Sequence, residues 1–557
     1  MRTRDIPLVV LYASLTATGA ILALAEYTSI IRTTGGPLRG EILRTARKSQ
    51  EYASFKGIPY AEPPLGHLRF KPPVEKRSWT DVLLAVNESD VCLQISMWNF
   101  STFGSENCLY MSVFTPHTLF GDNVNHSKAV MVYIYGGAYQ TGYANTEQYG
   151  PDYLMENDVI MVSFNYRLGA LGFLNLNHEN ATGNAALKDQ NLVLRWVKKN
   201  IAAFGGNPNR VTLFGHSSGA VSVDLHVLSE MSAGLFSRSI SMSGSPFCFY
   251  WGFESNAEAE FQALTLVKSL GIVTRNKSRM LERLYDVPAK EILKNMLALN
   301  YLGYRPTVER TKPATGERFL KRCPLDYYLS GKYNRMPHIM GLTSLEMISY
   351  PRGIIFFLLK NLLKNTLNIT FGIESNIFKD IEKLSKERVS ERPRKIFNEL
   401  LTITSEYIYD IGIDTKQRLM AKRNGYPIYY YKFIQSSGIF QRGNNIFNLT
   451  GVGHAEDLPF LFHIPVAELA FNDSNTNAMI DRFTRLITNF AKYDNPTPPS
   501  AEPADIPWPD SGPQGKHMVL SPNPKIVAAR PLSKRAAALE KLLRARYGTA
   551  FLNGCKT

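Results

Sequence analysis

Short apolar runs alternate with longer amphipathic stretches along most of this chain. A short apolar run that ends at a turn residue is typical of a strand buried on both faces of a sheet. Such runs lie at 129–135, 159–164, 210–214, 239–242, 339–341 and 428–433. Helix-favouring stretches lie at 187–204, 257–270, 478–492 and 530–546. The alternation of strands and helices predicts an α/β fold.

Composition and length point to one globular unit. The chain has 557 residues, of which 44% are apolar and 20% charged, and this excludes a disordered or collagenous protein. We find no internal repeat or low-complexity linker, and the Pro-rich segment 495–509 is expected to be a surface loop. A single domain over residues 26–557 is therefore expected.

The net charge of +15 adds little to this picture. A basic protein can bind nucleic acid or an acidic membrane when its charge is concentrated on one face. The densest basic stretch, 386–395, has acidic residues among its bases and is typical of a solvated face. Nucleic acid is therefore not an expected partner.

The first 25 residues have the pattern of a secretory signal peptide. Arg2 and Arg4 precede an apolar stretch at 6–20, and Ala23-Leu24-Ala25 supplies small residues at a cleavage site. The alternative is a signal anchor, which the Ser and Thr residues within the stretch disfavour. No later segment is apolar enough to span a bilayer, and no hydrophobic tail for a lipid anchor is seen. We expect a secreted, extracellular protein.

Secretion gives meaning to the N-x-[ST] sequons, which are acceptors for N-linked glycans. The sequons begin at Asn87, Asn99, Asn125, Asn180, Asn276, Asn368, Asn448 and Asn472. Matches of this kind also arise by chance, so we expect about half or more to be occupied.

The most informative motif is Gly215-His216-Ser217-Ser218-Gly219, which matches G-x-S-x-G. A strand run precedes it and a helical stretch follows it, as a nucleophilic serine on a strand-to-helix turn requires. The helix N-terminus favours a developing negative charge beside the Ser217 hydroxyl. The alternative is a Gly- and Ser-rich turn without chemistry.

Acyl transfer also needs donors for the oxyanion of the tetrahedral intermediate. The segment Tyr135-Gly136-Gly137-Ala138-Tyr139 follows a buried strand. The backbone N–H groups of Gly137 and Ala138 are candidates, together with the N–H of Ser218. One such donor stabilises the transition state by about 3–4 kcal/mol.

A neutral serine needs a base, and the base needs an orienting carboxylate. His454 lies in a glycine-bearing loop, and Glu346 follows a short strand run. The order Ser217, Glu346, His454 is the chain order of α/β-hydrolase triads. Because the chain has ten His residues, spacing alone leaves this assignment open.

Longer motifs surround these candidates. They are Phe55-Lys56-Gly57-Ile58-Pro59-Tyr60-Ala61-Glu62-Pro63-Pro64, Leu68-Arg69-Phe70, Ser105-Glu106-Asn107-Cys108-Leu109-Tyr110, and segments 165–169, 187–190 and 204–208. In this order they resemble the type-B carboxylesterase/cholinesterase family over nearly the whole mature chain. Segments 216–219, 231–236 and 241–245 are most similar to secreted arthropod carboxylesterases, which include juvenile hormone esterases.

The resemblance implies an α/β-hydrolase fold with a large, mostly parallel central sheet flanked by helices. It implies a catalytic triad of Ser217, Glu346 and His454. It further implies an oxyanion hole of Gly137, Ala138 and Ser218.

The chain departs from the family pattern at several positions. Ala138 replaces the usual third glycine, so its methyl group either crowds the acyl oxygen or requires a different backbone angle. Met347 replaces the glycine after the acid. His216 stands where cholinesterases carry Glu, which argues against a choline ester. Trp98 resembles the cholinesterase tryptophan that binds a cation, but the loop is shorter and we interpret Trp98 as packing.

The five cysteines are too few for a disulfide scaffold. By the resemblance, Cys92 and Cys108 form the family's first disulfide, and closing a loop of this length contributes about 3 kcal/mol in the chain-entropy account. Cys248 is expected to be a buried thiol. Cys323 and Cys555 are left unassigned.

We therefore expect a secreted serine carboxylesterase that acts on a small-molecule ester through an acyl-enzyme, without metal or cofactor. One alternative is a catalytically silent adhesion protein on the same fold, similar to neuroligins, and Ala138 is the feature that favours it. A second alternative is a juvenile-hormone or lipid esterase with a long acyl or alcohol chain. The oligomeric state is left open.

Overall fold

The structure is a computed structural model of the chain. It describes residues 26–96, 100–121, 126–299, 303–350, 354–355, 358, 391–437, 450–465, 474–500, 506–548 and 552. The expected signal peptide at 1–25 lies outside the described residues. Among the helices that are described, none combines the length and the hydropathy needed to cross a membrane.

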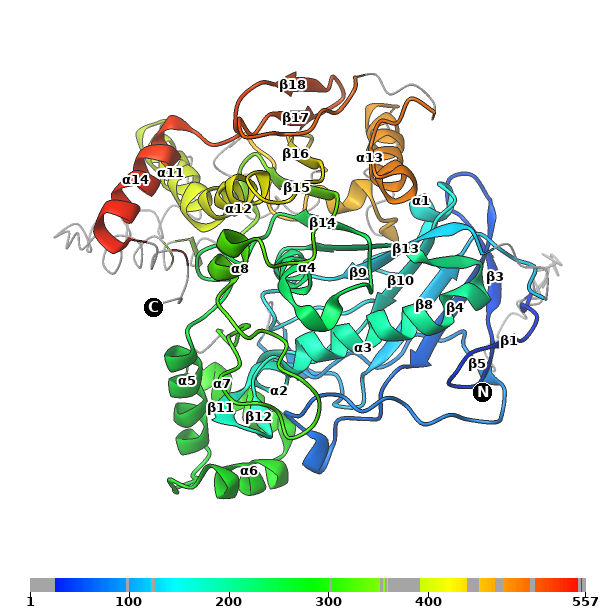
Figure 1. Ribbon diagram of the computed structural model, residues 1–557, viewed down its shortest axis with the longest axis vertical. Helices are drawn as coiled ribbons and strands as arrows, with labels where there is room; N and C mark the ends of the chain where they lie inside the picture. The colour runs from blue at the N-terminus through cyan, green and yellow to red at the C-terminus, as the bar shows by residue number, and fades with distance from the viewer. Residues whose placement is uncertain are drawn as a thin grey trace, which may run out of the picture.

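A sheet of 11 strands runs through the centre of the molecule (Figure 1). Its order is β18-β17-β16-β15-β14-β13-β9-β10-β8-β4-β3. The bounds are β3 Glu41–Arg44, β4 Glu51–Pro59, β8 Tyr110–Thr115, β9 Lys128–Ile134, β10 Ile160–Phe164, β13 Gly206–His216, β14 Arg238–Met242, β15 His338–Thr343, β16 Ile428–Phe433, β17 His517–Leu520 and β18 Lys525–Val527. Every pairing from β10 to β17 is parallel, and the pairings toward both edges are antiparallel. The predicted mostly parallel sheet is confirmed.

Helices cover this sheet and extend beyond it (Figure 1). Their bounds are α1 Asp152–Met155, α2 Gly169–Phe173, α3 Ala185–Asn200, α4 Ser218–Leu228, α5 Asn256–Ser269, α6 Lys277–Asp286, α7 Ala289–Ala298, α8 Pro324–Ser330, α11 Glu391–Ser405, α12 Ile411–Ala421, α13 Ser474–Tyr493 and α14 Lys534–Tyr547. A π-helical turn, η7 at Glu406–Asp410, joins α11 to α12. Three small sheets lie outside the main one. One has three strands, β1 Ile31–Arg32, β2 Pro37–Arg39 and β5 Leu83–Leu84. The other two are strand pairs, β6 Gln94–Ile95 with β7 Thr102–Phe103 and β11 Asn175–His178 with β12 Ala181–Thr182.

Each apolar run forms a strand because both of its faces are covered. The side chains of β9, β10 and β14 are almost wholly buried, so these strands do not alternate between apolar and polar residues. The helical stretch expected at 187–204 is helical from Ala185 to Asn200 and continues as a 3₁₀ turn to Phe204. The charged stretch near the C-terminus forms α14, as expected.

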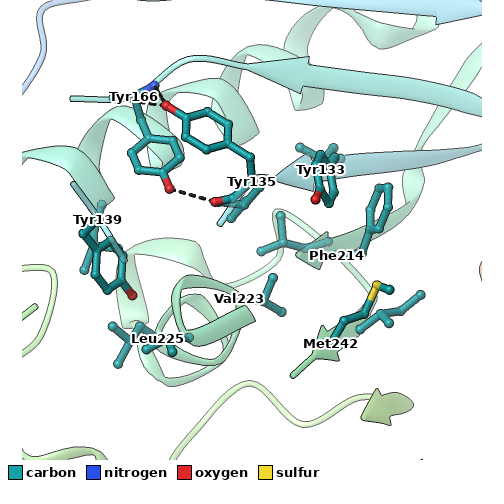
Figure 2. Packing of buried hydrophobic residues seen from close by; sticks show 14 of the residues in the cluster. Tyr133, Tyr135, Tyr139, Tyr166, Phe214, Val223, Leu225 and Met242 are labelled. Atoms are coloured by element: carbon teal, nitrogen blue, oxygen red, sulfur yellow. Dashed lines mark hydrogen bonds between the residues drawn. The ribbon is translucent and has the colours of Figure 1, made fainter. Parts of the chain in front are cut away.

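Stacked tyrosines fill the core at the C-terminal end of β9. The rings of Tyr135 and Tyr166 are stacked with centroids 4.4 Å apart. Figure 2 shows hydrogen bonds between them, of which the shortest runs from the Tyr166 hydroxyl to the Tyr135 carbonyl oxygen at 2.8 Å. Buried phenols of this kind combine a large apolar area with a hydroxyl that finds a partner.

A buried ion pair fixes helix α4 against the sheet and against α12. Lys416 Nζ lies 2.9 Å from Asp224 Oδ2 and 3.1 Å from His338 Nε2. The Ser241 hydroxyl donates to Asp224 Oδ1 at 2.6 Å. All of these groups are fully buried. Replacing either Lys416 or Asp224 by a neutral residue would therefore leave an uncompensated charge, at a cost of about 3–5 kcal/mol.

His226 is a second buried polar group of α4. Its ring Nδ1 lies 2.7 Å from Ser232 Oγ and its Nε2 lies 3.0 Å from Gln190 Oε1. Burial lowers the pKa of His226 from its ordinary value of 6.5 to about 3. The unfolded chain therefore binds a proton below about pH 6.5 that the folded chain does not bind.

We predict that His226→Gln reduces the sensitivity of the fold to acid. For a folded pKa of about 3, protonation of the unfolded state removes roughly 2 kcal/mol of stability between pH 7 and pH 5, and the variant lacks this contribution. The measurement is the free energy of urea unfolding at the two pH values. The variant can be less stable at both, but its loss between them should be smaller; an equal loss would contradict the assignment.

Candidate active site

Ser217 occupies a sharp turn between strand β13 and helix α4. Its backbone angles, φ 58° and ψ −125°, lie in a region that non-glycine residues rarely adopt. This bend brings the first turn of α4 against the end of β9. The approach is so close that a Cβ atom on Gly219 would lie 2.0 Å from the Ile134 carbonyl oxygen. A Cβ on Gly215 would lie 2.7 Å from the backbone of Gly219. The glycines of the motif are thus required by this close approach.

The backbone of Ser217 is held by neighbouring strand ends. Its N–H donates to the Met242 carbonyl oxygen at 2.9 Å, which ties the turn to β14. A Cβ on Gly136 would lie 2.8 Å from Ser217 Cβ, and one on Gly244 would lie 2.3 Å from the Ser217 carbonyl oxygen. The serine is therefore fixed where the C-terminal ends of three strands meet, the usual place for a site in an open α/β sheet.

Glu346 and His454 are joined by two hydrogen bonds. His454 Nδ1 lies 2.6 Å from Glu346 Oε2, and the His454 backbone N–H donates to the Glu346 carbonyl oxygen at 2.9 Å. Glu346 Oε1 accepts from the Ser243 hydroxyl at 2.7 Å and from the Thr343 N–H at 2.8 Å. Met347, which replaces the family's glycine, is buried, and its N–H donates to Ser405 Oγ at 3.0 Å.

These contacts keep Glu346 ionised although it is fully buried. Burial alone would raise the pKa of this carboxyl group. The hydrogen bond and charge of His454 act against burial, and the Thr343 N–H and the Ser243 hydroxyl add to them, so that the pKa lies below its ordinary value. The carboxylate is thus able to orient the imidazole and to stabilise its cation.

The second ring nitrogen of His454 faces the site. His454 Nε2 is buried and has no hydrogen-bond partner among the described residues. No hydrogen bond joins it to Ser217 Oγ, although both residues line the same cavity. Glu346 and His454 are therefore hydrogen-bonded to each other, and Ser217 lies on the wall of the cavity that His454 also lines. In an unliganded site the serine–histidine hydrogen bond is often long and tightens only with substrate.

Aromatic side chains enclose the His454 ring. The ring centroids of His216, Tyr409 and Tyr350 lie 4.4, 4.8 and 5.6 Å from it. The hydroxyl groups of Tyr350 and Tyr409 are hydrogen-bonded to each other. This packing restricts the rotation of the imidazole, which supports its fixed hydrogen bond to Glu346.

His216 brings no fixed charge to the site. It is buried, and burial together with the neighbouring His454 lowers the pKa of His216 well below its ordinary value. The imidazole is therefore neutral where a Glu would place a negative charge. The expectation that this position disfavours a cationic alcohol group follows from that neutrality.

The candidate oxyanion donors lie on the same cavity. Gly137 has φ 119° and Ala138 has φ 55°, and both residues line the cavity beside Ser217. Within the described part of the chain, neither of their N–H groups donates to a protein acceptor. The N–H of Ser218 belongs to the first turn of α4 and has no partner within the helix. Ala138 has a left-handed backbone conformation, and the glycine before it also has a positive φ angle.

The cavity itself has a volume of about 630 Å³. Its wall is formed by Ser96, Phe103, Gly136, Gly137, Ala138, Thr141, Gly142, Tyr143, Glu147, Gln148, Tyr149, His216, Ser217, Trp251, Tyr350, Ile354, His454, Ala455, Leu458 and Ile464. Aromatic and aliphatic side chains dominate this wall, and among the described lining residues Glu147 is the one carboxylate. A cavity of this size and character has room for a ligand with a sizeable apolar part.

A disulfide bond closes one segment of this wall. Cys92 is bonded to Cys108, as the resemblance implied, and Ser96 and Phe103 of the cavity wall lie between them. Cys248 is a free, buried thiol, as expected. Cys323 is also disulfide-bonded, whereas Cys555 and Trp98 lie outside the described residues.

Three of the sequon asparagines are described. Asn87 and Asn276 are exposed, and Asn180 is half-buried at the turn between β11 and β12. Asn276 caps α6 with its Oδ1 atom, which accepts from the Arg279 N–H at 3.1 Å and leaves Nδ2 for a glycan. Asn99, Asn125, Asn368, Asn448 and Asn472 lie outside the described residues.

Sequence reasoning missed several residues that shape the site. Ser243 lies within a segment that resembles the family, but its hydrogen bond to Glu346 has no sequence signal. Tyr350 and Tyr409 come from segments far apart in the chain and meet only in the folded protein. Trp251, on the cavity wall, follows an aromatic run that is equally typical of a core.

A serine at a strand-to-helix turn beside a Glu–His pair, on a doubly covered parallel sheet, is the arrangement of an α/β hydrolase. The protein-family model described as "Carboxylesterase family" matches residues 27–538 of the sequence. The chain therefore belongs to the carboxylesterase family, and it is a carboxylic ester hydrolase.

Individual relatives agree with this membership. The chain is 34% identical over 459 residues to a carboxylic ester hydrolase of Bombus ignitus, covering 78% of this chain and 80% of the relative. It is 30% identical over 485 residues to the juvenile hormone esterase of Tribolium castaneum, covering 81% and 82%. The crystal structure of juvenile hormone esterase from Manduca sexta, with OTFP covalently attached, superposes with a TM-score of 0.78 at 28% identity, covering 93% of this chain and 99% of that one.

We predict that Gly219→Ala is strongly destabilising. The new methyl group would meet the Ile134 carbonyl oxygen and the backbone next to it, so helix α4 must move away from β9. The expected loss is roughly 2–4 kcal/mol, seen as a lower thermal midpoint together with reduced ester hydrolysis. Gly121→Ala is the control, since a Cβ there has open space around it, and its midpoint should stay within a degree or two of the parent.

Proposed function

We propose that this enzyme is a secreted serine carboxylesterase with a Ser217–His454–Glu346 triad and an acyl-enzyme intermediate. The observation that carries the proposal is the bonded pair of His454 and Glu346 on the cavity that exposes Ser217. The other ring nitrogen of His454 is left without a protein partner on that cavity. A base that is already oriented and has one nitrogen to spare is what a neutral serine requires.

The reaction takes place in two acyl transfers. His454 accepts the Ser217 proton while Ser217 Oγ attacks the ester carbonyl carbon, and the tetrahedral oxyanion is stabilised by the N–H groups of Gly137, Ala138 and Ser218. His454 then protonates the leaving alcohol. Water attacks the acyl-enzyme with the same base, and the acid is released. Throughout, Glu346 stabilises the imidazolium.

The domain and compartment assignments belong to this proposal. Residues 26–557 form one catalytic domain, and residues 1–25 form a signal peptide that is removed. The Cys92–Cys108 disulfide and the exposed position of Asn87 and Asn276 support an extracellular protein, because disulfides and N-linked glycans form on the secretory route. Glycosylation of the eight sequon asparagines is expected in part.

The cavity favours a neutral ester with a large apolar group. Phe103, Trp251 and Leu458 on its wall offer apolar surface, and the neutral His216 offers no charge for a cationic alcohol. The named relatives include juvenile hormone esterases, so a hydrophobic hormone ester of that class is the second candidate. Hydrolysis rates for a series of esters with increasing acyl and alcohol chain length distinguish a lipid-like substrate from a short ester.

Covalent capture tests the triad directly. We expect the secreted enzyme to react with a fluorophosphonate probe at Ser217, identified by mass spectrometry of the labelled peptide, and Ser217→Ala to lower kcat by about a millionfold. A variant that keeps near-normal esterase activity, or a label on another residue, would remove Ser217 from the mechanism. An unlabelled, inactive parent enzyme would instead support the silent adhesion protein.

The Ser243 hydroxyl offers a quantitative test of the carboxylate's role. Ser243→Ala removes one of the hydrogen bonds to the ionised Glu346, so we expect kcat to fall by roughly 10- to 100-fold. Ser241→Ala is the matched control, because it removes a hydrogen bond to the buried carboxylate of Asp224, and neither Ser241 nor Asp224 lines the cavity. Equal losses of kcat in both variants would point to a general packing effect.

A further inference from the structure

The oxyanion segment contains two consecutive strained residues. Ala138 and Tyr139 both have positive φ, 55° and 62°, and neither is a glycine. This conformation costs free energy for residues with a Cβ and persists only where surrounding contacts fix it. The N–H groups proposed to bind the oxyanion lie at Gly137 and Ala138, directly before Tyr139. Whatever holds Tyr139 therefore determines where those donors point.

Several contacts fix Tyr139 in place. Its N–H donates to the side-chain oxygen of Ser218 at 3.3 Å, and its carbonyl oxygen accepts from the Gly169 N–H at 2.7 Å. Its ring packs edge-to-face on Phe173 with centroids 4.9 Å apart. Figure 2 shows the ring directed toward the helix that carries Leu225. Of these contacts, the one from Ser218 is made directly to the peptide unit that follows Ala138.

Ser218 also connects to the other end of the segment. Burial raises the pKa of the Tyr166 phenol, and the neighbouring Ser218 hydroxyl opposes that rise. Ser218 therefore lies beside the phenol whose hydroxyl donates to the Tyr135 carbonyl oxygen at 2.8 Å. Its side chain is thus placed between Tyr139 and the group bonded to Tyr135, and these two residues flank the two glycines and Ala138.

We propose that the side chain of Ser218, as distinct from its backbone N–H, is a positioning residue that sets the oxyanion hole. The inference rests on the proposed function, since it concerns the same acyl transfer. Without the hydroxyl, the Tyr139 N–H loses its acceptor and the strained pair is free to relax. The donors at Gly137 and Ala138 then meet the oxyanion less well, whereas the aromatic and aliphatic side chains of the wall, such as Trp251 and Leu458, stay in place. Such a loss is felt in the transition state rather than in substrate binding.

Ser218→Ala separates the hydroxyl from the backbone donor. We expect kcat to fall by roughly tenfold or more, while KM changes less than about twofold. The affinity for a trifluoromethyl ketone, which forms a tetrahedral adduct with the serine, should fall by a factor similar to that for kcat. The control is Ser229→Ala, which removes a buried hydroxyl at the C-cap of α4 that donates to the Phe319 carbonyl oxygen at 2.7 Å, outside the oxyanion segment. This control should retain the parent kcat.

A second variant tests the Tyr135 end of the oxyanion segment. Tyr166→Phe keeps the stacked ring but removes the hydrogen bond from Tyr166 to the Tyr135 carbonyl oxygen. We expect it to lower kcat in the same direction, and the double variant Ser218→Ala/Tyr166→Phe to lose less than the product of the single effects. This variant also decides the question where Ser218→Ala fails to fold.

Three results would overturn the proposal. They are an unchanged kcat in folded Ser218→Ala, a rise in KM with kcat preserved, and the same loss of kcat in Ser229→Ala. In each case Ser217 would still react with the fluorophosphonate, so the proposed function would stand. A failure of the proposed function is recognised separately, by Ser217→Ala that retains activity.

Discussion

The close approach of helix α4 to strand β9 is the constraint on which the rest of the site depends. Gly219 lies so near the Ile134 carbonyl oxygen that no side chain fits between them. This contact forces Ser217 into its strained turn and places the first helical turn beside the oxyanion segment. The buried pair of Asp224 and Lys416 then anchors the same helix from behind. Ser217 is thus held by packing and charge that lie outside the cavity.

The two halves of the site are fixed by different physics. The serine side is fixed by steric contact among backbone atoms, which is rigid because glycine leaves no alternative. The histidine side is fixed by electrostatics, since Glu346 is buried yet holds its charge through hydrogen bonds from His454, Ser243 and Thr343. Rigid backbone and preorganised dipoles together are what an enzyme needs to stabilise a charge that exists only briefly. The chain combines both on neighbouring strand ends.

Much of the fold could be predicted from sequence because strands such as 129–135 and 159–164 are buried on both faces and read as continuous apolar runs. The Ser217 turn was predictable because its glycines are needed locally. Assigning Glu346 and His454 needed the family resemblance, since their meeting depends on tertiary structure. The tyrosines around His454 and the hydrogen bond from Tyr139 to the Ser218 hydroxyl gave no signal, because contacts between residues far apart in the chain leave no periodic pattern in it. Cavity size was equally invisible to sequence.

The disulfide between Cys92 and Cys108 has a consequence for substrate choice. The disulfide encloses the short β6–β7 ribbon, and Ser96 and Phe103 of this segment line the cavity, while Ser217, Glu346 and His454 come from segments far along the chain. The central sheet therefore positions the three candidate catalytic residues, and the disulfide bond independently holds this segment of the cavity wall. Sequence change within that ribbon can alter which molecules fit the cavity and leave Ser217, Glu346 and His454 in place. The same fold can therefore acquire a different range of substrates without a change in the residues proposed for acyl transfer.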